Sequence, residues 1–509
     1  MARKKQAKSL RKSEGAREER GDVLDLKAAA AFLKVSKPTF YRWLAQGKIK
    51  GFKAGTQWRF YRHDLENFLH AEEPSALQVD SDALRAAVTK ARKSRGLKPI
   101  EWPEDETPEE STVIGTVHTL IGDAIAAGAS DIHLDNNVDE MLVRYRVDGV
   151  LSEAMSLPRH AAKPLVSRLK LMGDMNISER RVPQNGRIII EYQGREYDIR
   201  VTTVPAIYGE SAICRILDPG SVLIGLDKLG FSKPMQQAFE RILRIPNGLI
   251  VATGPAGSGR TTTLYSTLNL INSPEKKICT IEDPVEYQLR NVMQVHVNRK
   301  AGLTFPIALR TFMRSDPDVI LVGELRDMET IQACVSAAMT GHLVLTATLL
   351  ATAPAVVTRL IEVGLEPFLA GASLAGVLAQ RLVRRVCPHC AEEYDPSPTL
   401  LRRLSAQTDL DIAHAPFRRG EGCKECRGYG YRGRTGLFEL MEIDDRLREL
   451  IARPSSTDEL RAAAIDAGMT TMLKDGVEKA MQGVTTVEEV MRVLSPGLAQ
   501  TQGPQAQPG

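Results

Sequence analysis

The segment from residue 254 to residue 263, GPAGSGRTTT, constrains the fold more than any other part of the sequence. It follows a short apolar, β-rich run, NGLIVAT, and precedes a run with helical spacing, TTLYSTLNLI, so its glycines belong to a turn between a strand and a helix. Such a turn offers backbone N–H groups to a phosphate, and a threonine hydroxyl at the helix start can hold Mg²⁺. The segment therefore predicts a phosphate-binding P-loop made of Gly254, Gly257, Ser258, Gly259, Arg260, Thr261 and Thr262.

Arg260 stands where the P-loop pattern has lysine. Arginine keeps the charge, but its guanidinium is planar and longer than lysine, whose compact ammonium fits between the β- and γ-phosphates of a nucleotide. We therefore expect ATP binding to persist and hydrolysis to suffer. The alternative is a glycine-rich tight turn that binds no ligand.

Composition and length describe a multidomain globular protein. The chain has 509 residues, 26% of them charged, and it contains no run of eighteen apolar residues and no signal peptide. We expect a cytoplasmic protein whose contact with a membrane, if it has one, is made through partners. A net charge of +4 is too small to indicate nucleic-acid binding by itself, and seven cysteines in a cytosolic chain should be reduced.

Residues 21–70 have the pattern of a small DNA-binding unit, after a basic arm at 1–20 that we expect to be disordered. Asp25 and Ser36 can cap two short helices, and an alternating stretch around residues 54–56 predicts a two-stranded wing. The unit resembles the excisionase-type winged helix-turn-helix. Its candidate DNA contacts are Thr39, Tyr41, Arg42, Lys53, Arg59 and Arg62. The alternative is an adaptor domain that binds a protein and no DNA.

The remaining chain divides by composition. Residues 71–110 are charged and contain prolines, which is typical of a flexible linker, and residues 111–226 alternate in strand fashion around helical stretches, which predicts an α+β domain. An α/β nucleotide-binding domain is expected over 227–496. Residues 497–509 are rich in Gly, Pro and Gln and should be disordered.

Acidic residues follow two predicted strands of the α/β domain. TIEDPVEY carries Glu282, Asp283 and Glu286, which can bind Mg²⁺ or orient water, although a solvated acidic loop would look the same. Glu324 comes after the buried run of residues 319–322, at the end of a strand where ligands bind in open α/β sheets. Glu324 is the candidate general base, and we name Glu286 with it as a catalytic candidate.

Two C-x-x-C pairs predict a structural zinc site over residues 383–430, with Cys387, Cys390, Cys423 and Cys426 as ligands. Four thiolates leave no position open for water, so this site would stabilise a subdomain and catalyse nothing. The alternative is four free thiols. His389 lies between the first pair and is expected to be exposed.

Residues 111–496 resemble the secretion ATPase superfamily, the motors of type II secretion and type IV pilus assembly. The resemblance rests on a series of motifs in the family's order: SDIH, RYRVDG, ERRVPQNGRI, GPAGSGRTTT, TIEDPVEY, MRSDPDVILVGELRD, LAQRLVRRVCPHC and GYRGRTGLFEL. It implies a RecA-like ATPase domain with a zinc-knuckle insertion, preceded by a PAS-like domain, in a hexameric ring. It also implies that Glu282, Asp283 and Glu286 form an acidic box, that Glu324 acts in hydrolysis, and that Arg310 and Arg314 contact phosphates.

The chain departs from this family at a second position besides Arg260. Where the family has a His-Thr-Asn-Asp box, this chain has Leu349, Leu350, Ala351 and Thr352. Apolar side chains cannot hydrogen-bond a phosphate. The main hypothesis is therefore an ATP-binding subunit with weak or lost hydrolysis, in a homo-hexamer or a mixed ring with related ATPases near secretion or pilus platform proteins. The alternatives are an active assembly motor and a nucleotide-sensing DNA-binding regulator.

Overall fold

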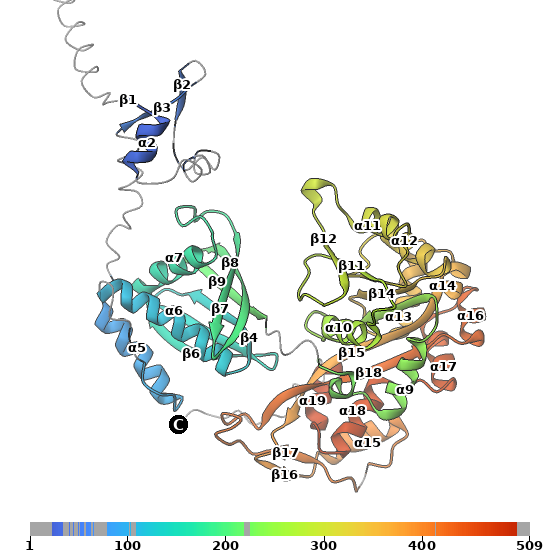
Figure 1. Ribbon diagram of the computed structural model, residues 1–509. Helices are drawn as coiled ribbons and strands as arrows, with labels where there is room; N and C mark the ends of the chain where they lie inside the picture. Colours follow the sequence, from blue (N-terminus) through green and yellow to red (C-terminus); the bar gives the residue numbers. More distant parts are fainter. Residues whose placement is uncertain are drawn as a thin grey trace, which may run out of the picture. The chain divides into compact units, whose positions relative to one another are not determined.

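The computed structural model describes residues 23–33, 51–54, 57–62, 79–100, 108–217, 224–412 and 414–495, together with residues 40, 44, 49, 65 and 102 (Figure 1). They form four sheets, which are described one at a time below. Among these residues, no helix is both long enough and apolar enough to cross a membrane.

The N-terminal unit contains a three-stranded antiparallel sheet in the order β1-β3-β2, where β1 is Val23–Asp25, β2 is Phe52–Ala54 and β3 is Gln57–Tyr61. The Asp25 carboxylate accepts a hydrogen bond from the Ala28 amide at 2.8 Å at the start of helix α2 (Leu26–Phe32), as its capping role predicts. The rings of Phe40 and Phe60 meet edge to face, 5.0 Å apart, in the core. The predicted wing is confirmed as β2 and β3, and β1 adds a third strand to it.

A helix lies inside the segment that we expected to be a linker. Helix α5 (Ser81–Ser94) is capped by Asp80, whose carboxylate accepts from the Ala83 amide, and it buries Leu84 and Val88. Apolar residues four apart lie on one face of a helix, and a capping aspartate stabilises its first turn. The expectation of an unstructured linker is therefore wrong for residues 81–94. The next helix, α6 (Pro108–Ala126), begins at Pro108.

The α+β domain has a six-stranded antiparallel sheet in the order β6-β5-β4-β9-β8-β7. The strands are β4 (Ala129–Asn136), β5 (Glu140–Val147), β6 (Val150–Pro158), β7 (Gln184–Tyr192), β8 (Arg195–Ala206) and β9 (Gly209–Leu217). The 3-10 turn η1 (Arg159–Ala161) and helix α7 (Ala162–Met172) follow β6. This region is the predicted α+β domain.

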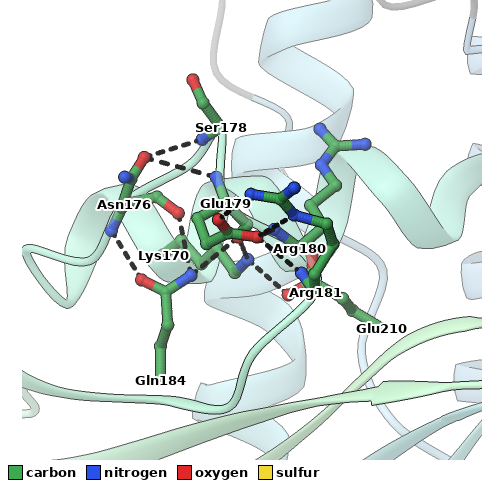
Figure 2. A network of polar contacts seen from close by, with 8 residues as sticks. All are labelled: Lys170, Asn176, Ser178, Glu179, Arg180, Arg181, Gln184 and Glu210. Carbon is green, nitrogen blue, oxygen red and sulfur yellow. Dashed lines mark hydrogen bonds and ion pairs between the residues drawn. The ribbon is translucent and has the colours of Figure 1, made fainter.

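Polar side chains fix the loop between α7 and β7 (Figure 2). The buried ammonium of Lys170 donates to the Glu179 carbonyl oxygen at 2.7 Å and forms an ion pair with Glu210. The Gln184 amide donates to the same carbonyl oxygen at 2.8 Å. The Arg181 guanidinium donates to both carboxylate oxygens of Glu179, and these bonds lower the pKa of Glu179 to about 2. The loop is thus held from both its backbone and its side chains.

The α/β domain has a seven-stranded sheet in the order β12-β11-β13-β14-β10-β15-β18. Its strands are β10 (Gly248–Thr253), β11 (Ile278–Glu282), β12 (Val292–His296), β13 (Val319–Val322), β14 (Leu343–Thr348), β15 (Leu374–Val386) and β18 (Tyr431–Glu442). All neighbours are parallel except β15 and β18. The carboxyl ends of β10, β11, β13 and β14 therefore share one edge of the sheet.

Helices cover both faces of this sheet (Figure 1). Leu249 and Val251 of β10 join a core that includes α11 (Phe305–Phe312), α12 (Met328–Met339), α13 (Ala353–Glu362), α14 (Pro367–Ser373), α16 (Asp445–Ile451) and α17 (Thr457–Asp466). Ile250 and Ala252 join the opposite core, with α8 (Leu226–Leu229), α9 (Lys233–Ile242) and α10 (Arg260–Ile271). This alternation explains why β10 reads as a continuous apolar run.

A small subdomain is inserted between β15 and β18. It contains the two-stranded sheet of β16 (Ala391–Glu393) and β17 (Arg418–Gly420), and helix α15 (Pro398–Thr408). Residues of α15 pack in one apolar cluster with α18 (Met472–Met481) and α19 (Val487–Leu494), which end the described chain. The inserted subdomain thus shares an apolar core with α18 and α19.

Candidate nucleotide and metal sites

The predicted P-loop connects β10 to α10. Gly254, Gly257 and Gly259 have φ angles of 153°, 75° and 90°, which L side chains rarely adopt. A Cβ at Gly254 would also lie 2.4 Å from the Gln380 carbonyl oxygen, so this position requires glycine. The loop folds because its sequence supplies glycine at each of these turns.

Polar groups on this loop fit a phosphate. Helix α10 begins at Arg260, so its first backbone amides face the loop. The Ser258 hydroxyl is buried and makes no hydrogen bond among the described residues, and the Thr261 side chain lines the cavity beside the loop. Thr262 is half-buried at the helix start. The donors expected of a phosphate site are therefore present.

The guanidinium of Arg260 is held against its own loop at the wall of the cavity. Its guanidinium donates to the carbonyl oxygen of Gly254 and, at 2.8 Å, to that of Pro255. Burial lowers the pKa of Arg260, and the nearby Glu324 and Glu286 act in the opposite direction. Arginine stays protonated even when its pKa falls, so the side chain holds a cation against the loop that carries it.

A cavity of about 170 Å³ lies beside the P-loop at the carboxyl edge of the sheet. The four predicted acidic residues line it together with Arg260 and Thr261. These four are Glu282, Asp283, Glu286 and Glu324. The structure thus brings residues from three parts of the sequence into one site, and carboxylates beside a threonine hydroxyl fit Mg²⁺.

Two arginines that sequence reasoning missed pair with these carboxylates. Arg326 forms a close ion pair with Glu324, and its other nitrogen lies 3.8 Å from Asp283. Arg299 donates to Asp283 at 2.9 Å. Glu324 must leave Arg326, or share it, to accept a proton from water. The sequence signal for the pair of Glu324 and Arg326 was their spacing, since the arginine follows the glutamate by two residues.

The remaining predicted residues of the site lie elsewhere. Arg310 pairs with Glu329 at 3.1 Å, and neither it nor the exposed Arg314 lines the cavity. Leu349, at the position of the family's histidine, leaves 59% of its surface exposed. Thr352 precedes α13 without a side-chain capping bond. Within one chain, these residues offer the cavity no polar group.

The four predicted metal-ligating cysteines form one cluster. Their Sγ atoms all lie within 4.8 Å of one another. Cys387 Sγ lies 3.9 Å from Cys423 Sγ, and Cys390 Sγ lies 3.8 Å from Cys426 Sγ. The Gly430 amide donates to Cys426 Sγ at 3.2 Å, which favours a thiolate. These four donors fit a tetrahedral metal ion without an open position.

The predicted DNA contacts are described only in part. Thr39, Tyr41 and Arg42 lie outside the described residues. The Lys53 ammonium lies 5.5 Å from the centre of the Trp58 ring, and the Arg62 guanidinium lies 5.3 Å from that of Phe32.

Arg59 is on β3, opposite Phe52 of β2. Lys53 and Arg62 thus each lie near one aromatic ring, within the range of a cation–π contact.

Comparison with known proteins agrees with this architecture. Residues 106–492 match the family model for type II/IV secretion system proteins, and residues 23–72 match a helix-turn-helix domain model. The chain is 42% identical over 434 residues to the type II secretion system protein E of Pseudomonas aeruginosa, covering 85% of this chain and 84% of the relative. It is also 42% identical over 393 residues to the type IV pilus assembly ATPase PilB of Thermus thermophilus, covering 76% of this chain and 44% of that relative.

The fold has a solved counterpart in the pilus retraction motor PilT with bound ADP. The two chains are 26% identical with a TM-score of 0.50, and the match covers 74% of this chain and 96% of the PilT chain. The RecA-like prediction is confirmed by this likeness and by the parallel sheet. The chain therefore belongs to the type II/IV secretion system protein family and carries a helix-turn-helix domain at its N-terminal end.

Proposed function

We propose that this protein binds ATP with Mg²⁺ and hydrolyses it slowly or not at all. The observation that carries the proposal is the position of Arg260, which donates to the carbonyl oxygens of its own P-loop. A lysine at this position would place a compact cation toward the phosphates. The positive charge of Arg260 therefore lies against the backbone of the P-loop and does not point toward the phosphates, where it would stabilise the transition state of hydrolysis.

The residues of the cavity would divide the work of binding. The amides at the start of α10 and the Ser258 hydroxyl would hold the phosphates, and Thr261 or Thr262 with the acidic loop would hold Mg²⁺. Bound Mg²⁺ supplies charge neutralisation for phosphoryl transfer. Glu324 would orient water, but its ion pair with Arg326 competes with that role.

The second departure acts on turnover as well. Leu349 and Leu350 replace a polar box, and apolar side chains stabilise no developing charge. Loss of one well-placed electrostatic group commonly costs about 3 to 4 kcal/mol of barrier, which is a hundredfold or more in rate. Two such losses leave binding possible and turnover far below the enzyme median of about 10 s⁻¹.

A steady-state ATPase assay on the full chain, beside equilibrium binding of a fluorescent ATP analogue, tests the proposal. We expect Mg²⁺-dependent binding and little hydrolysis. Fast hydrolysis that Glu324→Gln abolishes would instead identify an active assembly motor that tolerates Arg260 and the leucines. A chain that binds no nucleotide would show the P-loop to be a simple turn.

The cysteine cluster would bind Zn²⁺ in a structural role. Its four sulfur donors and the amide bond from Gly430 suit a closed site with no catalytic position. Because the cluster joins residues 387–390 to residues 423–426, the ion would tie together both ends of the inserted subdomain.

We also propose an assembly and a location for this chain, which its family membership supports. The chain would work in a hexameric ring, alone or mixed with related ATPases, on the cytoplasmic side of a secretion or pilus platform. Arg310 and Arg314 lie outside the cavity of their own chain, so their expected contact with phosphates would require a neighbouring subunit.

A second candidate function is DNA binding by residues 21–70, favoured by the helix-turn-helix match and by the basic wing. Salt-dependent binding of residues 1–75 to duplex DNA in a gel shift would support it. Arg42→Ala should cost about 1 to 3 kcal/mol on a specific site, whereas Arg59→Ala should weaken all sequences alike. Capture of a protein partner without DNA retention would make the domain an adaptor.

A further inference from the structure

The carboxylate of Glu282 is enclosed by hydrogen-bond donors from three elements. Tyr265, on α10, donates through its hydroxyl to Glu282 Oε2 at 2.5 Å. Thr280, on β11, donates to Glu282 Oε1 at 2.6 Å. The Gln294 amide, on β12, lies 3.4 Å from the same Oε1. These hydrogen bonds are buried, because Tyr265 is 1% exposed and Glu282 is 4% exposed.

These bonds leave Glu282 little capacity to bind a metal. A carboxylate oxygen accepts about two hydrogen bonds. Oε1 already has Thr280 and, more weakly, Gln294 as donors, and Oε2 has Tyr265. Gln294 is fixed in turn, since its amide donates to the Tyr287 carbonyl oxygen at 2.8 Å and accepts from the Leu289 amide at 2.6 Å. The environment of Glu282 is that of an anchored group.

The anchor joins two parts of the candidate site. Tyr265 belongs to the helix that begins at the P-loop, and Glu282 leads directly into Asp283 and Glu286 at the edge of the cavity. Burial and the hydrogen bond to Glu282 raise the pKa of Tyr265, so its hydroxyl remains a donor at every physiological pH.

We propose that Tyr265 and Glu282 are positioning residues: their hydrogen bond sets the distance between the P-loop and the acidic loop 283–286, and Glu282 is not itself a ligand of Mg²⁺. The inference rests on the proposed Mg²⁺-nucleotide binding and replaces the expected metal-ligand role of Glu282. It assigns the metal-facing role to the half-buried Glu286, whose carboxylate accepts no hydrogen bond from the described residues.

The test measures how much Mg²⁺ the full chain needs to bind a fluorescent ADP analogue. Tyr265→Phe should raise the Mg²⁺ concentration for half-maximal binding about tenfold, because a charged hydrogen bond is lost and the acidic loop shifts. Glu286→Gln, which removes a ligand, should raise it about thirtyfold or more. Glu282→Gln should raise it only about threefold, because the amide still accepts from Tyr265.

Nucleotide binding without Mg²⁺ is the control for folding, because the P-loop amides do not depend on the anchor. It should stay within about twofold of the unsubstituted chain in all three variants. If Tyr265→Phe unfolds the protein, Thr280→Val removes the other donor at the same volume and should raise the Mg²⁺ requirement in the same direction.

Two results would overturn this inference alone. One is an unchanged Mg²⁺ requirement in Tyr265→Phe, and the other is a Glu282→Gln variant that loses as much as Glu286→Gln, since Glu282 would then be a ligand. Absence of nucleotide binding by the unsubstituted chain would overturn the proposed function together with the inference, so the two failures are distinguishable.

Discussion

The cysteine cluster and the P-loop lie in the same α/β domain, yet they keep their chemistry to different degrees. All four cysteines converge on one point, with every Sγ atom within 4.8 Å of the others. The P-loop has its strand, its glycines and its helix, but its cation is turned onto its own carbonyl oxygens. The cysteine cluster therefore has all four sulfur donors of a metal site. The P-loop has the backbone of a phosphate site, but its cationic side chain is bound to its own loop.

The difference separates groups that fold the domain from groups that turn over substrate. A closed metal site contributes directly to folding, because the ligands meet only in the folded chain. Arg260 lies on the P-loop and Leu349 is largely exposed, while Leu350 packs only at the margin of the core, so we expect the sheet to tolerate changes at these positions. We therefore expect loss of metal to damage structure, and restoration of the altered residues to change rate alone.

The largest expected effect follows removal of metal from the cysteine cluster. Binding of structural zinc is commonly worth about 10 to 16 kcal/mol in small domains, so Cys423→Ser or a strong chelator should unfold residues 387–430. Metal analysis should find zinc bound to the unsubstituted chain, and limited proteolysis should cut the inserted subdomain only after its removal. Nucleotide affinity should change by less than about twofold.

If the protein purified without chelator is fully folded and free of metal, then the cysteine cluster is not a structural metal site. Cys334→Ser is the matched control, because Cys334 is a buried cysteine of α12 outside the cluster. It should leave the metal content unchanged.

The next effect concerns turnover. Arg260→Lys alone should raise the ATPase rate little, because the polar box is still missing. Combining it with Leu349→His and Leu350→Thr should raise the rate about a hundredfold, since both groups act on the same developing charge. Steady-state phosphate release measures the change.

Nucleotide affinity should move by less than about fivefold in the combined variant, because the phosphate contacts of the backbone are unaltered. If the combined variant hydrolyses ATP no faster than the natural chain, then the cause of slow turnover lies elsewhere, for example in the ion pair of Glu324 with Arg326.

The smallest effect is on stability in acid, beside the cysteine subdomain. Glu489 is buried and accepts hydrogen bonds from Arg384 at 2.8 Å and from Arg492 at 2.7 Å. Burial alone would raise the pKa of Glu489, but these bonds outweigh it and lower the pKa below its ordinary value. The stabilisation is therefore complete above the unfolded-state pKa of about 4.3 and is lost as the pH falls below it.

Glu489→Gln should lower the free energy of unfolding by about 2 kcal/mol at pH 7 and by less at pH 4. Denaturant unfolding at the two pH values measures this, with zinc present throughout. An equal loss at both values would mean that the charge of Glu489 contributes nothing.

The sequence predicted those parts of the fold that depend on local backbone chemistry. The glycines of the P-loop, the cap at Asp25 and the wing are short-range features, so their residues identify them directly. Glu324 was placed correctly at the sheet edge because parallel strands deliver their ends to one side.

What the sequence could not predict depends on distant partners. Tyr265 and Gln294 read as ordinary helix and strand residues, although both contact Glu282. The anchoring of Glu282 needs three elements to meet, which no spacing shows. Helix α5 was missed for a different reason: its charged surroundings hid the two apolar residues, Leu84 and Val88, on which it packs.

Strand β15 connects the P-loop to the cysteine cluster. In its middle, the Gln380 amide donates to the Ser258 carbonyl oxygen of the P-loop at 2.8 Å, and its last residue, Val386, directly precedes Cys387. At about 3.3 Å per residue, some 20 Å of hydrogen-bonded strand lies between them. Amide hydrogen exchange along this strand can therefore report on both sites at once. Fraying that starts at a metal-free Cys387 would have to break the pairs with β18 one after another before it reached the nucleotide loop.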